Sequence, residues 1–183
     1  MSSDQRWQRL DKRLVVDRSP FARAYDLDFR LPDGRVITNW LQVDLPPFAI
    51  TFPLTTNGDV IFVRQYRQVV DDYLLELSAG HLEADESPQA AAARELLEEC
   101  GAVATDWRSL GRYVMDANRG CGWAHVFLAR EAQIVAPSNS GDIGEISVHL
   151  LPLPEVKRRW QAGEFVSAPT ALAIGLALAA LGV

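Results

Sequence analysis

Three glutamates, Glu95, Glu98 and Glu99, stand close together in the sequence and could bind a metal ion. On a helix, residues three and four apart are neighbours, so their carboxylates would share one side, about 5–6 Å from one another. Crowded carboxylates repel, and near the C-terminal end of a helix the macrodipole also opposes negative charge. A divalent cation relieves both effects, and oxygen ligands without a cysteine or histidine pattern favour Mg²⁺ or Mn²⁺. Taken alone, such a cluster is more often a solvated helix face than a metal site.

The residues around this cluster resemble the Nudix box. The pattern of that family is G, five residues, E, seven residues and then R-E-U-x-E-E-x-G-U, where U is a bulky aliphatic residue. Here Gly80 begins the pattern, Glu86 follows at its spacing, and Arg94 opens the run that contains the three glutamates. All seven fixed identities match, and the only departure is Ala102 in the last aliphatic position. The resemblance identifies the chain as a member of the Nudix hydrolases.

The resemblance implies a divalent metal site, with Mg²⁺ as the expected ion and Mn²⁺ as a substitute. The implied ligands are Glu95 and Glu99, with Glu98 assisting, and the backbone carbonyl of Ala79. Glu98 and Glu99 thereby also become candidate catalytic residues. Glu86 and Arg94 would orient the ligands through a carboxylate–guanidinium pair. The chemistry expected of such a site is attack by water on a phosphorus atom of a pyrophosphate.

Residues outside the box resemble the ADP-ribose pyrophosphatases. The stretches 64–67 and 75–80 are similar to the segment before the box in those enzymes, where proline usually stands in place of Ser78. The implied substrate is ADP-ribose or another ADP-sugar, which would give AMP and a sugar phosphate. By resemblance Arg67 contacts the substrate phosphate and Glu76 a ribose hydroxyl. Arg64 would face the opposite side of a regular strand, so both arginines reach phosphate only if the strand ends or bulges between them.

A general base is also needed, and in similar enzymes it is a glutamate on a loop well beyond the box. The polar segment 138–145 precedes a predicted strand and offers Glu145 and Asp142. We favour Glu145 over Asp142 because the longer side chain reaches further from a strand edge.

Strand and helix signals alternate irregularly along the chain. Segments 24–29 and 35–43 flank a Pro-Asp-Gly turn and predict an N-terminal antiparallel hairpin, while 49–54 and 60–66 flank Asn57-Gly58 and predict a second hairpin. Further strands are expected at 73–77, 113–115, 124–128 and 146–151, and helices at 87–100, 154–161 and 169–181. This mixture indicates an α+β fold. The family resemblance specifies it as a Nudix-type α/β/α sandwich with a mixed β-sheet.

Composition limits the remaining possibilities. The 183 residues carry a net charge of −6, which argues against a large nucleic-acid footprint and leaves nucleotide-sized ligands open. Two cysteines exclude a disulfide framework. The apolar stretch 168–183 is shorter than the roughly twenty residues that span a bilayer, and the N-terminus lacks a secretion signal, so no membrane partner and a cytoplasmic location are expected. We expect a polar N-terminal arm over 1–20 and one domain over 21–183.

The sequence leaves more than one possibility for the substrate and the function, and it predicts the oligomeric state only by resemblance. Related ADP-ribose enzymes exchange N-terminal sheet segments, so the hairpin within 21–45 predicts a homodimer. The loop 118–122 lacks the Ser-Pro-Gly of many ADP-ribose enzymes, which leaves open another nucleotide sugar, a dinucleoside polyphosphate or a dinucleotide coenzyme as substrate. A non-catalytic nucleotide-sensing module is a third alternative, although such modules usually lose box carboxylates and none is lost here.

Overall fold

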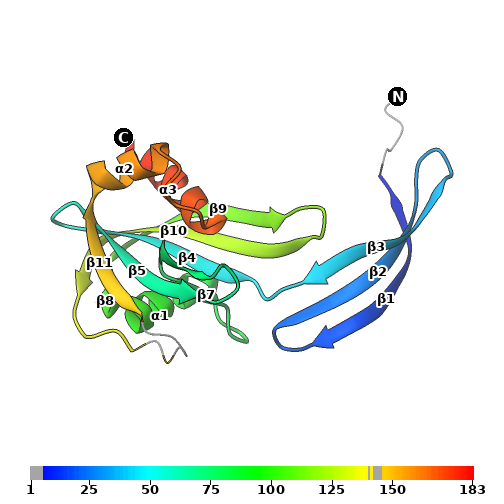
Figure 1. Ribbon diagram of the computed structural model, residues 1–183, viewed down its shortest axis with the longest axis horizontal. Coiled ribbons are helices and arrows are strands. Elements are labelled where there is room, and N and C mark those ends of the chain that lie inside the picture. The colour runs from blue at the N-terminus through cyan, green and yellow to red at the C-terminus, as the bar shows by residue number, and fades with distance from the viewer. Residues whose placement is uncertain (1–5, 140, 142–145) are drawn as a thin grey trace. The chain divides into compact units, whose positions relative to one another are not determined.

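The chain divides into two compact units (Figure 1). The computed structural model describes residues 6–139, 141 and 146–183. One unit comprises the chain up to Pro46 together with Val114–Trp123, and the other comprises Pro47–Tyr113 and Ala124–Val183. The strands β9 (Asp106–Asp116) and β10 (Cys121–Ile134) therefore contribute to both units.

The N-terminal unit contains a three-stranded antiparallel sheet with the order β1-β2-β3. Its strands are β1 (Gln8–Arg18), β2 (Ala22–Arg30) and β3 (Val36–Asp44). The pairing of β2 with β3 confirms the predicted N-terminal hairpin. Within the stretch for which a polar arm over 1–20 is predicted, residues 8–18 form β1, whose backbone pairs with β2 while its side chains remain mostly exposed.

The second unit is built on a larger sheet with the order β11-β5-β4-β10-β8, in which β6 also pairs with β5, β7 with β4 and β9 with β10. The pair formed by β10 and β4 is parallel and the neighbouring pairs are antiparallel, so the sheet is mixed as predicted. Its other strands are β4 (Phe48–Thr55), β5 (Asp59–Arg67), β6 (Asp72–Glu76), β7 (Ala79–His81), β8 (Ala102–Val103) and β11 (Ser147–Pro152).

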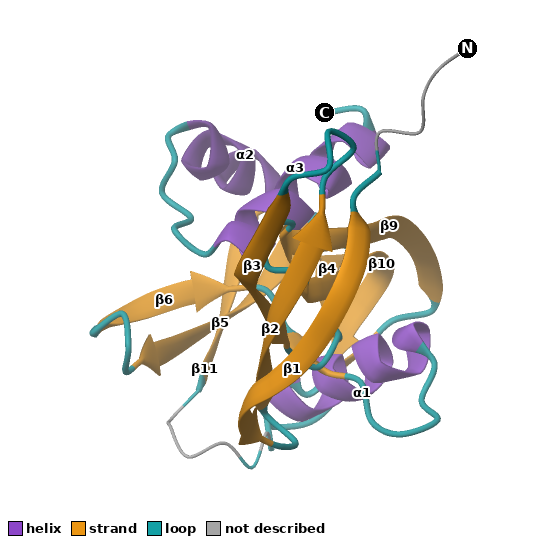
Figure 2. Cartoon of the chain, turned by 90° about the vertical axis from the view of Figure 1, so that its right-hand side faces the viewer, coloured by secondary structure: helices purple, strands orange, loops and turns teal. Residues whose placement is uncertain are grey.

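Helices cover both faces of this sheet. In Figures 1 and 2, α1 (Pro88–Cys100) lies on one side and α2 (Leu153–Gln161) and α3 (Ala168–Leu181) lie on the other. The strand β5 is covered on both faces, because Ile61 packs in a cluster with Leu96 of α1, while the ring of Phe62 stacks at 5.4 Å on Phe165 in the connection between α2 and α3. The predicted α+β sandwich is confirmed.

The helix that carries the acidic cluster begins and ends where its sequence predicts. Ser87 accepts a hydrogen bond on its hydroxyl from the backbone N–H of Ala90 at 3.2 Å, and Pro88 occupies the first turn, where a missing N–H costs nothing. Gly101 ends the helix in the left-handed conformation at φ 60° and donates to the carbonyl of Leu97. The caps fix which residues form the last turn and therefore where the glutamates stand.

Within the described part of the chain, the helices are too short or too polar for any of them to cross a bilayer.

Candidate active site

The three glutamates of α1 differ in exposure. The side chain of Glu98 is 42% exposed and that of Glu95 is 15% exposed, whereas Glu99 is a buried residue. The carboxylate of Glu99 accepts a hydrogen bond on Oε2 from the backbone N–H of Ala79 at 3.0 Å. This bond places Ala79, predicted as a metal ligand through its carbonyl, directly beside the acidic helix.

Arg94 is the centre of the acidic cluster. Its Nε and Nη2 donate to the two carboxylate oxygens of Glu86 at 3.0 and 3.1 Å, and its Nη1 donates to Glu95 at 2.6 Å and to Glu98 at 3.0 Å. A further bond from Nη2 reaches the carbonyl of His81 at 3.0 Å. The predicted pair of Arg94 with Glu86 is thus present as a bidentate pair, which lowers the pKa of Glu86 and raises the pKa of Arg94.

Gly80 lets the chain pass close to the helix. A Cβ atom built on this residue would lie 1.9 Å from Oε1 of Glu95, so only glycine permits this approach. The approach forms one wall of a cavity of about 340 Å³ beside the acids. The cavity is lined by Gly80, His81, Leu82, Glu83, Arg94, Glu95 and Glu99.

The donors of this cluster fit a hard divalent cation, because they are carboxylate oxygens without a sulfur or imidazole ligand. Among the described residues, however, no three His, Cys, Asp or Glu side chains are arranged as a metal-binding group. The ion pairs explain this arrangement: Glu95 and Glu98 both turn toward the guanidinium of Arg94. Metal binding therefore requires these two carboxylates either to turn away from Arg94 or to contact Arg94 and the ion at the same time.

The two predicted substrate arginines do not converge. The register of β5 with β6 continues without a shift, so residues 64 and 67 lie on opposite faces of the pair. The guanidinium of Arg64 lies over the ring of Tyr73 at 4.1 Å, whereas Arg67 forms an ion pair with Glu76 at 2.6 Å. The bulge that would have brought both arginines to one phosphate is absent from this described strand pair.

Arg67 and Glu76 line a cavity of about 410 Å³. The side chain of Arg67 is 44% exposed and that of Glu76 is 11% exposed. Residues 166–169, at the start of α3, line the same cavity. The structure therefore brings together the two side chains that the resemblance assigns to the substrate, and it pairs them with each other.

The predicted general bases, Glu145 and Asp142, lie outside the described residues.

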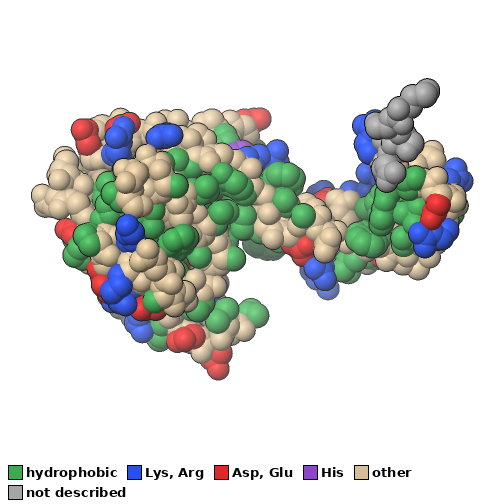
Figure 3. Space-filling model, turned by 90° about the horizontal axis from the view of Figure 1, so that it is seen from above, with side chains coloured by type: hydrophobic (Ala, Val, Ile, Leu, Met, Phe, Trp, Pro, Cys, Tyr) green, Lys and Arg blue, Asp and Glu red, His purple; other side chains and the backbone are tan. Residues whose placement is uncertain are grey.

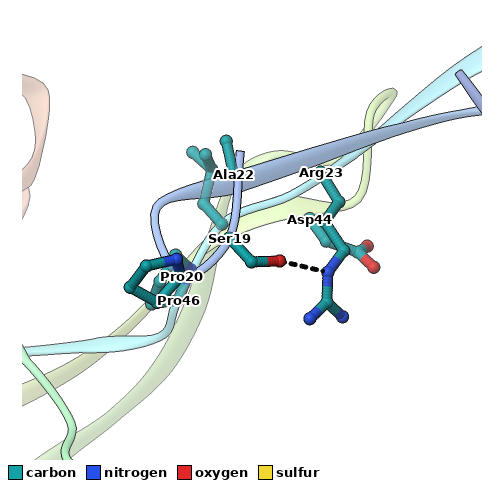
Figure 4. Close-up of a pocket in the computed structure, with 7 residues that line it drawn as sticks. Ser19, Pro20, Ala22, Arg23, Asp44 and Pro46 are labelled. Atoms are coloured by element: carbon teal, nitrogen blue, oxygen red, sulfur yellow. Dashed lines mark hydrogen bonds between the residues drawn. The ribbon is translucent and has the colours of Figure 1, made fainter. Parts of the chain in front are cut away.

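Another cavity, of about 290 Å³, lies in the N-terminal unit (Figure 4). Arg23 donates from Nε to the hydroxyl of Ser19 at 2.8 Å, and that hydroxyl donates to Asp17 at 2.5 Å. These polar groups satisfy one another, and none of the predicted site residues lines this cavity.

Sequence reasoning missed one buried polar contact, at the start of the segment that leads to the acidic helix. Thr170 of α3 is 1% exposed, and its hydroxyl accepts a hydrogen bond from the backbone N–H of Leu77 at 3.3 Å. Thr170 stands in an apolar stretch 93 residues from Leu77, and no spacing pattern links the two.

Comparison with known proteins matches most of this chain to one domain family. The NUDIX domain model matches residues 45–168. An ADP-ribose pyrophosphatase of Bacillus subtilis is 29% identical over 170 residues, which cover 90% of this chain and 91% of that protein. An ADP-ribose pyrophosphatase of Mycobacterium tuberculosis is 32% identical over 144 residues, which cover 75% of this chain and 67% of that protein.

A solved structure shares the fold. The crystal structure of an ADP compounds hydrolase matches with a TM-score of 0.85 and 21% identity, over all of this chain and 97% of the other. The family match spans more than half of the chain and includes the whole acidic helix. The chain therefore belongs to the NUDIX domain family and is a Nudix hydrolase, as its box residues predict.

Proposed function

We propose that this chain hydrolyses the pyrophosphate of ADP-ribose or a related ADP-sugar, giving AMP and a sugar phosphate. The observation that carries the proposal is the complete acidic cluster around Arg94, which stands beside a cavity in a chain that is similar to two ADP-ribose pyrophosphatases.

The protein supplies a cation site whose ligands are held before substrate arrives. A bound Mg²⁺, held by Glu95, Glu98, Glu99 and the carbonyl of Ala79, would neutralise charge on the phosphate oxygens and lower the pKa of a bound water. Arg94 anchors the cluster through Glu86, and the N–H of Ala79 fixes Glu99. Glu99 is therefore held in place, whereas Glu95 and Glu98, which both accept hydrogen bonds from Arg94, must reorient toward the ion when it binds.

The reaction needs a proton acceptor for the attacking water. Glu145 takes that proton as the water oxygen bonds to phosphorus and the bond from phosphorus to the bridging oxygen breaks. Asp142 is the alternative acceptor. On the substrate side, Arg67 binds phosphate oxygens and Glu76 a ribose hydroxyl, so the bond between these two side chains must open or be shared when substrate enters.

The substrate is tested with purified protein, Mg²⁺ and a panel of nucleotides. The panel contains ADP-ribose, ADP-glucose, a UDP-sugar, a dinucleoside polyphosphate and a dinucleotide coenzyme, and the products are separated by ion-exchange chromatography. The highest kcat/KM is expected for ADP-ribose, with AMP and ribose 5-phosphate as products. A clear preference for a compound that is not an ADP-sugar would contradict the proposal.

The metal assignment is tested by the double variant Glu98→Gln/Glu99→Gln. We expect kcat to fall about 100-fold or more, since loss of outer groups alone costs about 10–100-fold. The matched control is Glu155→Gln/Glu164→Gln, which also neutralises two ion-paired acids of this unit but lies outside the cluster. Hydrolysis by the first variant at the rate of the control would reject the assignment.

We also propose that the N-terminal sheet mediates a homodimer. Among the described residues of its unit, only Leu27 and Cys121 are buried apolar side chains. Large apolar side chains of this unit remain exposed, among them Leu14, Val15, Phe21, Val36 and Leu41. Figure 3 shows hydrophobic side chains at the surface of this unit, among charged and other polar ones. A three-stranded sheet without a covered apolar face has little stability of its own, and exposed apolar patches mark protein interfaces. A second copy of this chain is the occupant that the family resemblance implies.

A further inference from the structure

The short segment 77–80 runs from the end of β6 into β7, and the chain then continues to the acidic helix. Its first residue, Leu77, is 2% exposed, so its backbone N–H needs a partner within the protein. Thr170, itself 1% exposed, supplies that partner through its hydroxyl oxygen at 3.3 Å. The start of α3 is thus tied to the start of the segment.

The end of the same segment is tied to α1. The N–H of Ala79 donates to Glu99 at 3.0 Å. Gly80 lies so close to Glu95 that an added Cβ would meet its carboxylate at 1.9 Å. The strand β4 holds the later part of this path, because it pairs with residues 79–81 and the N–H of Thr51 donates to the carbonyl of Ser78 at 3.0 Å. Thr170 holds the other end, at Leu77, and the path between them lies against two carboxylates.

Replacing the hydroxyl of Thr170 would act on this path rather than on packing. At 3.3 Å the hydrogen bond is slightly longer than the usual range of about 2.7–3.2 Å, so its own contribution to stability is small. A valine has nearly the same shape as threonine but accepts no hydrogen bond, and it would leave a buried N–H at Leu77 without a partner. The segment would have to shift to regain one, and the carboxylates would shift with it.

We propose that Thr170 is a positioning residue for the carboxylates of α1, acting through the backbone of residues 77–80 on Glu99 and Glu95. The inference rests on the proposed function, because it assumes that these carboxylates hold a divalent cation.

The test compares Thr170→Val with Thr170→Ser, which keeps the hydroxyl. Binding of Mn²⁺ alone is measured by electron paramagnetic resonance, and kcat and KM are measured over a range of Mg²⁺. Thr170→Val is expected to lower Mn²⁺ affinity about 10-fold, the lower end of the effect of groups that orient ligands. Its loss of activity should be partly recovered at high Mg²⁺. Thr170→Ser should bind Mn²⁺ like the wild type.

A second buried threonine provides the control. Thr51 is fully buried, and its hydroxyl has no hydrogen-bond partner among the described residues. Thr51 contacts the segment 77–80 only through its backbone in the described structure, since its N–H donates to the carbonyl of Ser78 at 3.0 Å. Thr51→Val keeps this bond and removes a hydroxyl that has no partner, so we expect unchanged Mn²⁺ affinity. Equal loss in Thr51→Val and Thr170→Val would show a general effect of the substitution and overturn the inference.

Other outcomes separate this inference from the proposed function. Wild-type Mn²⁺ affinity in folded Thr170→Val, or equal loss in Thr170→Ser, overturns the role of the hydroxyl and leaves the proposed function intact. If Thr170→Val does not fold, the inference is tested by amide hydrogen exchange of the wild type. An amide at Leu77 that exchanges as fast as one in an exposed loop would overturn the inference. A wild type that binds no Mn²⁺ overturns the proposed function itself.

Discussion

A single guanidinium organises the acidic cluster. From spacing alone Arg94 pairs with Glu98 one turn later, and the family resemblance adds Glu86. The structure adds Glu95 and the carbonyl of His81, because the planar fork of arginine carries five N–H donors. One cation thus contacts three carboxylates, which offsets part of the repulsion that makes a divalent ion attractive at this position.

The first prediction concerns Gly80, whose φ lies outside the left-handed region, so alanine is tolerated by its backbone. The added Cβ would displace the carboxylate of Glu95. We expect Gly80→Ala to fold, to lower kcat/KM about 10–100-fold, and to require a higher Mg²⁺ concentration for its half-maximal rate. Steady-state kinetics over a range of Mg²⁺ measure both.

Gly175→Ala is the control for crowding. Its Cβ would meet the ring of Trp160 at 2.8 Å, so it also forces a side chain to move, but no acid is involved. It should lower thermal stability and leave kcat unchanged. If both alanine variants keep full activity, the close approach of Gly80 to Glu95 has no catalytic importance.

At the scale of elements, caps determine where the acidic helix stands. The second prediction is that Ser87→Ala lowers the free energy of unfolding by about 1 kcal/mol, because the N–H of Ala90 loses its acceptor. In a protein of this size, that corresponds to a fall of about 2–4 °C in the melting temperature.

Ser87 and Ser167 both stand at the N-cap of a helix, so their alanine variants can be compared directly. Ser167 stands at the N-cap of α3 but makes no side-chain cap hydrogen bond. Ser167→Ala should therefore change the melting temperature by less than Ser87→Ala does. Equal effects measured by calorimetry would refute the assignment of the cap bond as the source of stability.

The third prediction concerns pH and the N-terminal sheet. Arg13 donates two hydrogen bonds to Asp28 at 2.9 Å and the N–H of Asn39 donates a third at 3.0 Å, which together lower the pKa of Asp28 to about 2. An unfolded aspartate has a pKa of about 3.9. The charged form is favoured in the folded state, so this stabilisation is present above pH 4 and is lost as the pH falls toward 2.

Urea unfolding of the wild type and of Asp28→Asn, from pH 7 to pH 2, measures this effect. The wild type should be more stable above pH 4, and the difference should shrink as the pH falls. In an Arg13→Gln background the difference should be smaller at every pH in this window. A difference that is constant down to pH 2 would contradict the pKa assignment.

Local signals predicted most elements, and tertiary pairing formed the others. The strands and helices with turn residues or caps at their ends were found, as Ser87 and Gly101 show. The strand β1 was missed because residues 8–18 lack an alternating apolar pattern and are held by backbone pairing with β2. In the site, box spacing identified the acids, but the contacts of Thr170 with Leu77 and of Arg67 with Glu76 depend on folding and leave no local pattern.

At the scale of the whole molecule, the N-terminal sheet exposes the apolar surface that a second copy would cover. The fourth prediction is that Leu14→Asp, at a side chain that is 52% exposed on β1, raises the dimer dissociation constant about tenfold or more. A charge in an apolar interface must be desolvated without a partner. Light scattering at micromolar concentration measures the mass.

Val183→Asp is the control, because Val183 is also 52% exposed but lies at the end of α3. The variant Val183→Asp should have the same mass in solution as the wild type. A wild-type protein with the mass of one chain would refute the dimer.

The division into two units follows a discontinuous path, since the chain passes between them after Pro46, after Tyr113 and after Trp123. In the N-terminal unit, the N–H of Val43 donates to the carbonyl of Arg119 and the indole of Trp40 to that of Asn118. Deleting residues 1–46 would therefore not leave an intact catalytic unit. It would remove the donors that bond to the carbonyls of Asn118 and Arg119, in the turn between β9 and β10. A chimaera of two homologues joined at residue 47 should fold only if the N-terminal sheet of one parent can form these hydrogen bonds with the β9–β10 turn of the other.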